Sequence, residues 1–307
     1  MSEPQLNSKT YSGASGPTLL ITAGVHGDEY EPMLGVRSLF PVLESAKLRG
    51  KVVLVPVVNA AAFERGARTA EDGLDLARVC PGTLDGSITE RTAHFLSELI
   101  RTADFYIDLH TGGTAYALVP LAGYGLHREP AILETQRRMA REFNLPFIWG
   151  TTPNLNGRSL SVARDAGVPA IYVEHGGGAG FNVTAVADLN AGCLNVMAEL
   201  KMIDRPAPHR LKQEIVEDPS PESGHLQINY PSPLNGIFES AAPLGRRIQT
   251  GEVIGRITDP NTGDSATVRA EKSGLLIMLR ALPRVRIGDA LATIVPPPLS
   301  ATGGTNA

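Results

Sequence analysis

The segment 24–29, Gly-Val-His-Gly-Asp-Glu, places an imidazole and a carboxylate three residues apart. His26 and Glu29 are two of the residue types that bind Zn²⁺ in proteins. The apolar, β-branched run 17–23 predicts a buried strand before them, and the apolar spacing of 30–40 predicts a helix after them. The pair would therefore lie on a strand-to-helix turn. Alone it has a second interpretation, because a glutamate near this position also caps the start of many helices.

Polar side chains also end three other predicted strands. Asn59, His110 and Glu174 come at or just after the ends of their strands, which are the apolar runs 51–58, 105–110 and 169–174. In a parallel sheet ligands bind beyond the carboxyl ends of the strands. These three side chains and His26 are therefore expected to lie along one edge of a sheet.

The elements that would position these residues alternate between strand and helix. Helical patterns cover 89–101, 131–143, 159–166 and 184–202, and a further short strand is predicted at 146–149. Such alternation indicates an α/β fold, a mostly parallel sheet flanked by helices. The polar stretch 60–79 is predicted to be irregular, and the tails 1–15 and 296–307 are predicted to be loose.

The pattern changes after about residue 206. Short apolar runs now alternate with glycine turns, at 236–238, 251–257, 274–277 and 285–294. This pattern is typical of a small β-barrel or sandwich. The glycine turns are similar to those of biotinyl and lipoyl domains, but no lysine stands in the setting that those carriers modify. We therefore expect a catalytic domain at 1–205 and a β-rich scaffold domain at 206–307.

Composition excludes several classes of protein. The 307 residues are 42% apolar and 20% charged, with a net charge of −4 and no Lys/Arg block, which argues against nucleic acid as a partner. No apolar run reaches the ~20 residues that a membrane helix needs. The first 17 residues lack the apolar core of a signal peptide, and two cysteines make no disulfide framework. A cytoplasmic location is expected.

Taken together, the motifs resemble the succinylglutamate desuccinylase/aspartoacylase family over the whole chain. The matching residues are His26-x-x-Glu29, Asn59 with Arg68 nine residues on, Asp75-Leu76-x-Arg78, Asp108-Leu109-His110 and Glu174-x-Gly176-Gly177. The resemblance implies a zinc hydrolase with a carboxypeptidase-like fold. The chain length and the residues after His26 are most similar to bacterial members that remove acyl groups from amino acids.

The resemblance also implies a role for each residue of the catalytic centre. His26, Glu29 and His110 would hold zinc, which leaves a coordination position for water, as catalytic zinc sites do. Glu174 would be the general base and pass a proton to the leaving amine. Arg68 would polarise the scissile carbonyl and stabilise the oxyanion.

The implied substrate contacts are Arg78, Asn59, Asp75 and Arg164. Arg78 would hold a substrate carboxylate with its fixed fork of donors. Arg164 matches a family position only by its spacing, ten residues before Glu174. The chain has Ala77 where the family usually has an asparagine that contacts substrate, so the substrate is expected to differ more than the chemistry.

Other interpretations of these residues stay open at this point. Glu174 can be a surface carboxylate, and Arg68 and Arg78 can be solvated loop charges. Arg65 competes with Arg68 for the role at the carbonyl. Asp108 lies two residues before His110 on the same strand face, where it can support the histidine as a second-layer partner.

The sequence therefore predicts a zinc amidohydrolase that cleaves the acyl group from a small N-acyl amino acid or related amine. Two alternatives are a metallocarboxypeptidase acting on peptides and a non-catalytic metal- or ligand-binding protein. Affinity order alone does not select Zn²⁺ over Co²⁺, Mn²⁺ or Ni²⁺. The β-rich region is expected to limit substrate size, either by covering one side of the cleft or by packing against a neighbouring subunit in a homo-oligomer.

Overall fold

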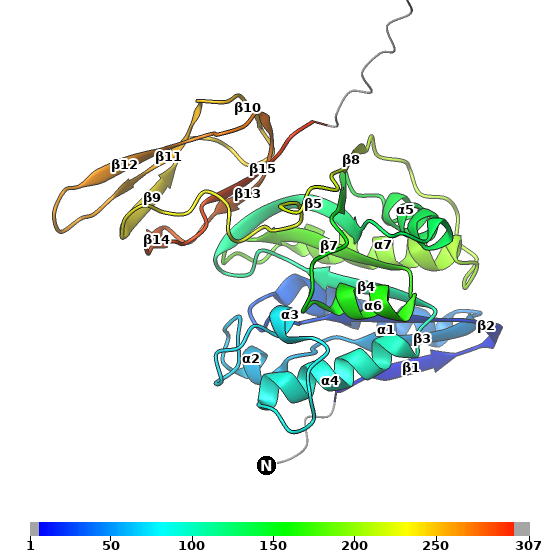
Figure 1. Ribbon diagram of the computed structural model, residues 1–307. Coiled ribbons are helices and arrows are strands. Elements are labelled where there is room, and N and C mark those ends of the chain that lie inside the picture. Colours follow the sequence, from blue (N-terminus) through cyan, green and yellow to red (C-terminus); the bar gives the residue numbers. More distant parts are fainter. Residues whose placement is uncertain (1–5, 298–307) are drawn as a thin grey trace, which may run out of the picture.

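A computed structural model of the chain describes residues 6–297 and is built around one mixed sheet of 11 strands (Figure 1). The main path through this sheet is β1-β3-β2-β4-β7-β5-β13-β10, with β15 paired to β13, β6 to β5 and β8 to β6. The strands are β1 (Lys9–Ser12), β2 (Ala14–Ala23), β3 (Arg49–Val55), β4 (Phe105–His110), β5 (Tyr116–Gly125), β6 (Phe147–Thr151), β7 (Ala170–Gly177), β8 (Glu214–Glu217), β10 (Arg247–Ile248), β13 (Gly274–Arg280) and β15 (Ala292–Val295).

The centre of the sheet is parallel, which confirms the predicted architecture. β2 pairs in parallel with β3 and β4, and β4 pairs in parallel with β7. Ala23 lies opposite Leu109, and His110 lies opposite Glu174. The carboxyl ends of these three central strands therefore reach the same edge of the sheet, where the polar residues predicted to meet are found.

Helices cover both faces of this sheet. They are α1 (Tyr30–Ser45), α2 (Ala60–Glu64), α3 (Leu76–Val79), α4 (Ile88–Arg101), α5 (Pro130–Phe143), α6 (Ser159–Ala166) and α7 (Val183–Glu199). Leu19 and Ile21 of β2 face a core shared with α1, α5 and α7, whereas Leu20 faces a core shared with α4 and α6. Because successive strand side chains point to opposite faces, a strand covered on both sides needs an unbroken apolar run. That is why the central strands could be predicted from sequence.

After α7 the described part of the chain is β-rich, as predicted. A second sheet of 4 strands has the order β12-β11-β9-β14 and is antiparallel. Its strands are β9 (Gly236–Ser240), β11 (Val253–Thr258), β12 (Ser265–Arg269) and β14 (Arg284–Val285). Hydrogen bonds cross the proposed boundary at residue 205, because β8 pairs with β6 and β13 pairs with β5. The β-rich part therefore extends the catalytic sheet.

Several local predictions were wrong. Residues 9–15 were expected to be loose, but β1 pairs antiparallel with β3 and β2 begins at Ala14. Residues 298–307 of the other predicted loose tail lie outside the described range. β5 was not predicted either, because it contains Pro120 and Gly123, two residues that usually interrupt strands.

The stretch 60–79 also contains more regular structure than predicted. The short helices α2 and α3 both lie within it. Asn59 caps α2 by accepting a hydrogen bond from the backbone N–H of Ala62, and Asp75 caps α3 by accepting one from the N–H of Ala77. Such caps satisfy N–H groups that a helix start otherwise leaves unpaired.

The close packing between α5 and α7 leaves no room for a side chain at Gly192. A Cβ atom there would lie 2.2 Å from Cε1 of the buried Phe143 ring. Gly192→Ala should therefore lower the free energy of unfolding by about 1–3 kcal/mol, despite the better helix propensity of alanine. Urea unfolding measures this change. Gly180→Ala is the control, because its Cβ would meet no atom within 4 Å. Equal midpoints for both variants would show that the α5–α7 contact is looser than described.

Candidate metal centre and active site

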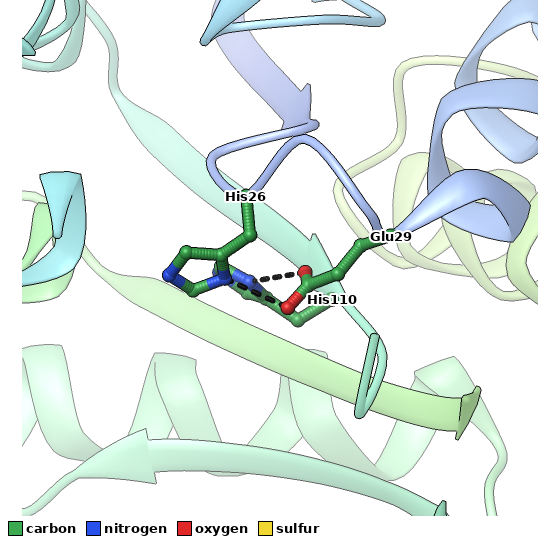
Figure 2. Close-up of side chains that lie close together, drawn as sticks. All are labelled: His26, Glu29 and His110. Carbon is green, nitrogen blue, oxygen red and sulfur yellow. Dashed lines mark hydrogen bonds and ion pairs between the residues drawn. The ribbon is translucent and has the colours of Figure 1, made fainter. Parts of the chain in front are cut away.

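Three buried side chains converge at the carboxyl edge of the sheet (Figure 2). His26 and Glu29 lie on the turn between β2 and α1, and His110 is the last residue of β4. Glu29 Oε1 lies 2.7 Å from His26 Nδ1, and Glu29 Oε2 lies 3.0 Å from His110 Nδ1. One ligand atom from each residue lies within 4.8 Å of the others. This geometry brings together the three predicted metal ligands.

The outer nitrogen of each histidine faces a carboxylate. His26 Nε2 lies 3.1 Å from Asp75 Oδ1, and His110 Nε2 lies 3.1 Å from Asp108 Oδ2. Histidines that bind metals usually donate their other N–H to such a partner, which fixes the tautomer and the ring orientation. Both Nδ1 atoms are thereby left to face Glu29. This donor set fits a divalent transition metal with two nitrogen ligands and one oxygen ligand.

The charges at this centre favour an ionised carboxylate. Burial alone would raise the pKa of Glu29, but His26 and His110 hold it well below its usual range. Burial alone would lower the pKa of His110, but Asp108 and Glu29 raise it well above its usual value. A metal ligand must be deprotonated, so a bound cation would take the place of the imidazole proton.

Glu174 has the features of a proton acceptor. It lies on β7 directly opposite His110, and its buried Oε2 has no hydrogen-bond partner within residues 6–297. Burial raises its pKa to about 8. An unpaired carboxyl group with a raised pKa, next to a candidate metal site, is typical of a catalytic base.

Arg68 reaches the same place from the loop after α2. Its Nε and Nη2 donate to Asp75 Oδ2 at 3.1 and 2.9 Å, and its Nη1 lies 3.9 Å from Glu29 Oε1. Arg68 lines the cavity next to these groups, whereas Arg65 directly follows α2 and is absent from the cavity lining. The geometry therefore favours Arg68 over Arg65 for a role at the substrate.

A cavity with about 1070 Å³ of space outside protein atoms, part of it open to solvent, adjoins these groups. Much of its wall is apolar, from Leu118, Leu126, Leu155, Leu160, Leu226 and Met278. The β-rich part contributes Gly224, Leu226, Gln227 and Met278. This arrangement supports the expectation that the β-rich region covers one side of the cleft.

The predicted substrate contacts occupy different positions. Arg78 lines the cavity beside Ala77, and its Nη1 donates to the Ala77 carbonyl at 2.7 Å. Arg164 also lines the cavity, but its guanidinium donates to the Pro153 carbonyl, to Asn156 Oδ1 and to Asp165 Oδ1. Its predicted grip on substrate would have to compete with these partners.

Asn59 and Asp75 are absent from the cavity lining. Asn59 is 1% exposed and caps α2. Asp75 lies between His26 and Arg68, and contacts both. The structure therefore gives these two residues supporting positions, and their predicted direct contact with substrate stays a prediction.

Arg158 was missed by the sequence analysis. It precedes α6, lines the cavity, and donates from Nη1 to the Gly224 carbonyl at 3.1 Å. Among the described residues no carboxylate lies within ion-pair distance of it. Burial and the nearby Arg78 lower its pKa to about 10. The signal in the sequence was its place at the start of a predicted helix, where polar side chains of an α/β fold often meet a ligand.

Comparison with known proteins gives consistent matches. The family model described as succinylglutamate desuccinylase/aspartoacylase catalytic domain matches residues 15–200. An N-alpha-acetyl-L-2,4-diaminobutyric acid deacetylase from Halomonas elongata is 31% identical over 288 residues, which cover 91% of this chain and 82% of that protein.

Two solved structures are similar in fold over most of their length. One is a succinylglutamate desuccinylase from Silicibacter sp. TM1040, with a TM-score of 0.84, 26% identity, and coverage of 94% of this chain and 87% of that one. The other is the product-bound ectoine utilization protein EutE (DoeB) from Ruegeria pomeroyi, with a TM-score of 0.84, 25% identity, and the same coverage of 94% and 87%.

The support of His110 by Asp108 can be tested through metal affinity. Asp108→Asn removes the charge that faces His110 Nε2, so the affinity for Zn²⁺ should fall by about 10–100-fold. Titration against a competing chelator measures it. Asp104→Asn, an exposed residue at the other end of the same strand region, should leave the affinity unchanged. Equal affinities in the two variants would remove Asp108 from the support of the metal centre.

Proposed function

This chain belongs to the succinylglutamate desuccinylase/aspartoacylase family, and from that premise we propose that it is a zinc-dependent amidohydrolase acting on N-acylated amino acids or related small amines. One observation carries the proposal. The buried triad of His26, Glu29 and His110 lies beside an unpaired Glu174 and an arginine, Arg68, at the end of one cavity. This set provides metal ligands, a base and an oxyanion donor within one site.

Zinc is proposed because of the donor set. Two imidazole nitrogens and one carboxylate oxygen suit this borderline cation, and both imidazoles are oriented by carboxylates. When bound by His26, Glu29 and His110, zinc would supply Lewis-acid polarisation of water and of the substrate carbonyl.

Glu174 would move the proton. Its carboxylate would take a proton from the attacking water and deliver it to the leaving nitrogen, because an amide nitrogen leaves only when it is protonated. The raised pKa of Glu174 suits both steps, since a carboxyl group with a pKa near neutrality both accepts and releases a proton readily. No other described protein group engages its Oε2, so this oxygen is not already committed to a hydrogen bond.

Arg68 would stabilise the charge that develops on the carbonyl oxygen. Asp75 engages its Nε and Nη2, which holds the guanidinium plane and leaves Nη1 directed toward the metal centre. A donor held in place before the reaction needs no reorganisation in the transition state. In this proposal Asp75 would act through Arg68 and His26, which it contacts.

The amino acid part of the substrate is proposed to bind through its α-carboxylate. Arg78 and Arg158 line the cavity, and neither has a carboxylate within ion-pair distance among the described residues. A guanidinium offers two parallel donors that match a carboxylate. The deacetylase from Halomonas elongata acts, by its name, on an acetylated diamino acid, so an N-acetyl amino acid is the first substrate to test.

The alternatives differ in what the site would do. A metallocarboxypeptidase would cleave a C-terminal residue from a peptide, and a non-catalytic protein would bind zinc without turnover. No helix within the described range is long and apolar enough to cross a membrane. The cytoplasmic location and the homo-oligomer stay predictions from sequence.

A substrate panel with metal analysis tests the proposal. We expect one zinc per chain and hydrolysis of at least one N-acetyl, N-succinyl or N-formyl amino acid in preference to peptides. Glu174→Gln should lower kcat by about 10²–10⁴-fold with zinc retained, because only proton transfer is removed. Glu98→Gln, an exposed glutamate on α4, is the control. Zinc without turnover on any substrate would favour the binding protein, and no zinc after remetallation would reject the metal centre.

The pKa of Glu174 predicts the direction of the pH profile. Burial raises it to about 8, although the neighbouring His110 favours the charged form. A divalent cation on the adjacent ligands would also favour the carboxylate and place the pKa below that value. Because the carboxylate is the form that accepts a proton, kcat/KM should rise with pH through this pKa and then level off. A value of kcat/KM that falls between about pH 5 and pH 8 would contradict the role of Glu174 as the base.

A further inference from the structure

One wall of the cavity is formed where the β-rich part joins the catalytic sheet. There β5 and β13 pair antiparallel, with Leu118 opposite Met278 and Tyr116 opposite Arg280. Tyr116, Leu118 and Met278 all line the cavity. This junction is therefore part of the surface that a substrate meets.

Arg280 is held rigidly behind that wall. Its side chain is only 9% exposed, and its guanidinium donates to Asp289 Oδ2 at 3.2 Å and to the carbonyls of Leu282 and Arg284 at 3.0 and 3.1 Å. Nη1 donates to the Tyr116 hydroxyl at 3.3 Å, and the guanidinium carbon lies 5.3 Å from the centre of the Tyr116 ring. A fixed cation thus holds both the ring and the hydroxyl of Tyr116.

This arrangement leaves the hydroxyl hydrogen of Tyr116 without an acceptor among the described residues. A hydroxyl that accepts from a cation is polarised and becomes a stronger donor. Its neighbours in the cavity wall, Leu118, Leu226 and Met278, are apolar. Tyr116 is partly exposed, so water can accept this hydrogen until a ligand fills the cavity. Once a ligand excludes that water, an unmade hydrogen bond among these apolar neighbours is unfavourable, so a ligand with an oxygen at this point would be preferred over one without it.

We propose that Tyr116 is a specificity-determining residue that donates a hydrogen bond to an oxygen of the substrate beyond the scissile amide and the α-carboxylate. Arg280 is the positioning residue that orients the donor. The oxygen belongs either to the acyl group or to the amino acid side chain. This inference rests on the proposed function, because it assumes an N-acyl amino acid in the cavity.

The test compares variants of the full, zinc-loaded chain on matched substrates. Tyr116→Phe removes only the hydroxyl. Arg280→Met removes the cation, and Arg280→Lys keeps a charge in its place. Tyr230→Phe is the matched control, because that hydroxyl accepts from the backbone N–H of Glu271 and is absent from the cavity lining.

Two pairs of substrates would show which part of the substrate carries the oxygen that Tyr116 contacts. N-succinyl and N-butyryl norvaline differ at the end of the acyl group, and N-acetyl glutamate and N-acetyl norvaline differ in the side chain. Tyr116→Phe should raise KM about tenfold for the oxygen-bearing member of one pair. Its kcat on that substrate, and its KM and kcat on the other three, should change by less than about twofold. Arg280→Met should reproduce this pattern, and Arg280→Lys should restore part of the preference.

A binding measurement keeps the inference separate from the proposed function. Calorimetry on Glu174→Gln, with and without Tyr116→Phe, reports affinity for the same substrates without turnover. Suppose that the wild type hydrolyses these substrates but Tyr116→Phe has the same KM values, or that Tyr116→Phe loses the same factor on all four substrates. Either result would overturn the role of Tyr116 and leave the proposed function standing. A shared fall in kcat and melting temperature would show that the pair is only structural. A wild-type chain that neither binds nor hydrolyses any substrate would overturn both proposals.

Discussion

The buried carboxylate of Glu29 connects the polar residues at the carboxyl edge of the central sheet. Its oxygens lie 2.7 Å from His26 Nδ1 and 3.0 Å from His110 Nδ1, and it accepts a hydrogen bond from the backbone N–H of Thr111. A buried charge is tolerated only when its oxygens are paired, so the turn after β2 and the end of β4 must stay in register. Asp75 connects His26 to Arg68 on the loop after α2. Asp108 pairs with His110 and lies in the core under α6. This network therefore fixes the turn after β2, the end of β4 and the loop that carries Arg68 relative to one another.

The sequence was most informative where one local pattern determines both structure and position. His110 ends β4, His26 lies on the turn after β2, and Glu174 follows the apolar residues that begin β7. Parallel pairing then brings these positions to one edge. Their meeting could be predicted because the run of buried residues identifies a central strand, and the end of that strand identifies the edge. The family resemblance added the proposed roles, and the structure brings His26, His110 and Glu174 to the lining of one cavity.

The rest could not be predicted, because it depends on contacts between loops that are far apart in sequence. Spacing from Glu174 pointed to Arg164, but α6 directs that guanidinium to Pro153, Asn156 and Asp165. Arg158, at the other end of the same helix, faces the cavity because the chain near Gly224 packs beside it. β5 could not be recognised in the sequence because it contains Pro120 and Gly123. Its antiparallel pairing with β7 could not be predicted either, because no local sequence pattern indicates it.

The hydrogen bonds of Asp108 have a consequence for how two ligands affect one another. Asp108 Oδ2 lies 3.1 Å from His110 Nε2 and also accepts a hydrogen bond from the Ser159 hydroxyl, and Ser159 is the residue after Arg158. A metal on His110 and a carboxylate on Arg158 would thus both act on one short, buried chain of contacts. Linkage makes such an effect reciprocal: the factor by which an anionic substrate changes metal affinity equals the factor by which the metal changes substrate affinity. If the two ligands are coupled through Asp108, metal retention and substrate retention would be two readouts of one coupling free energy.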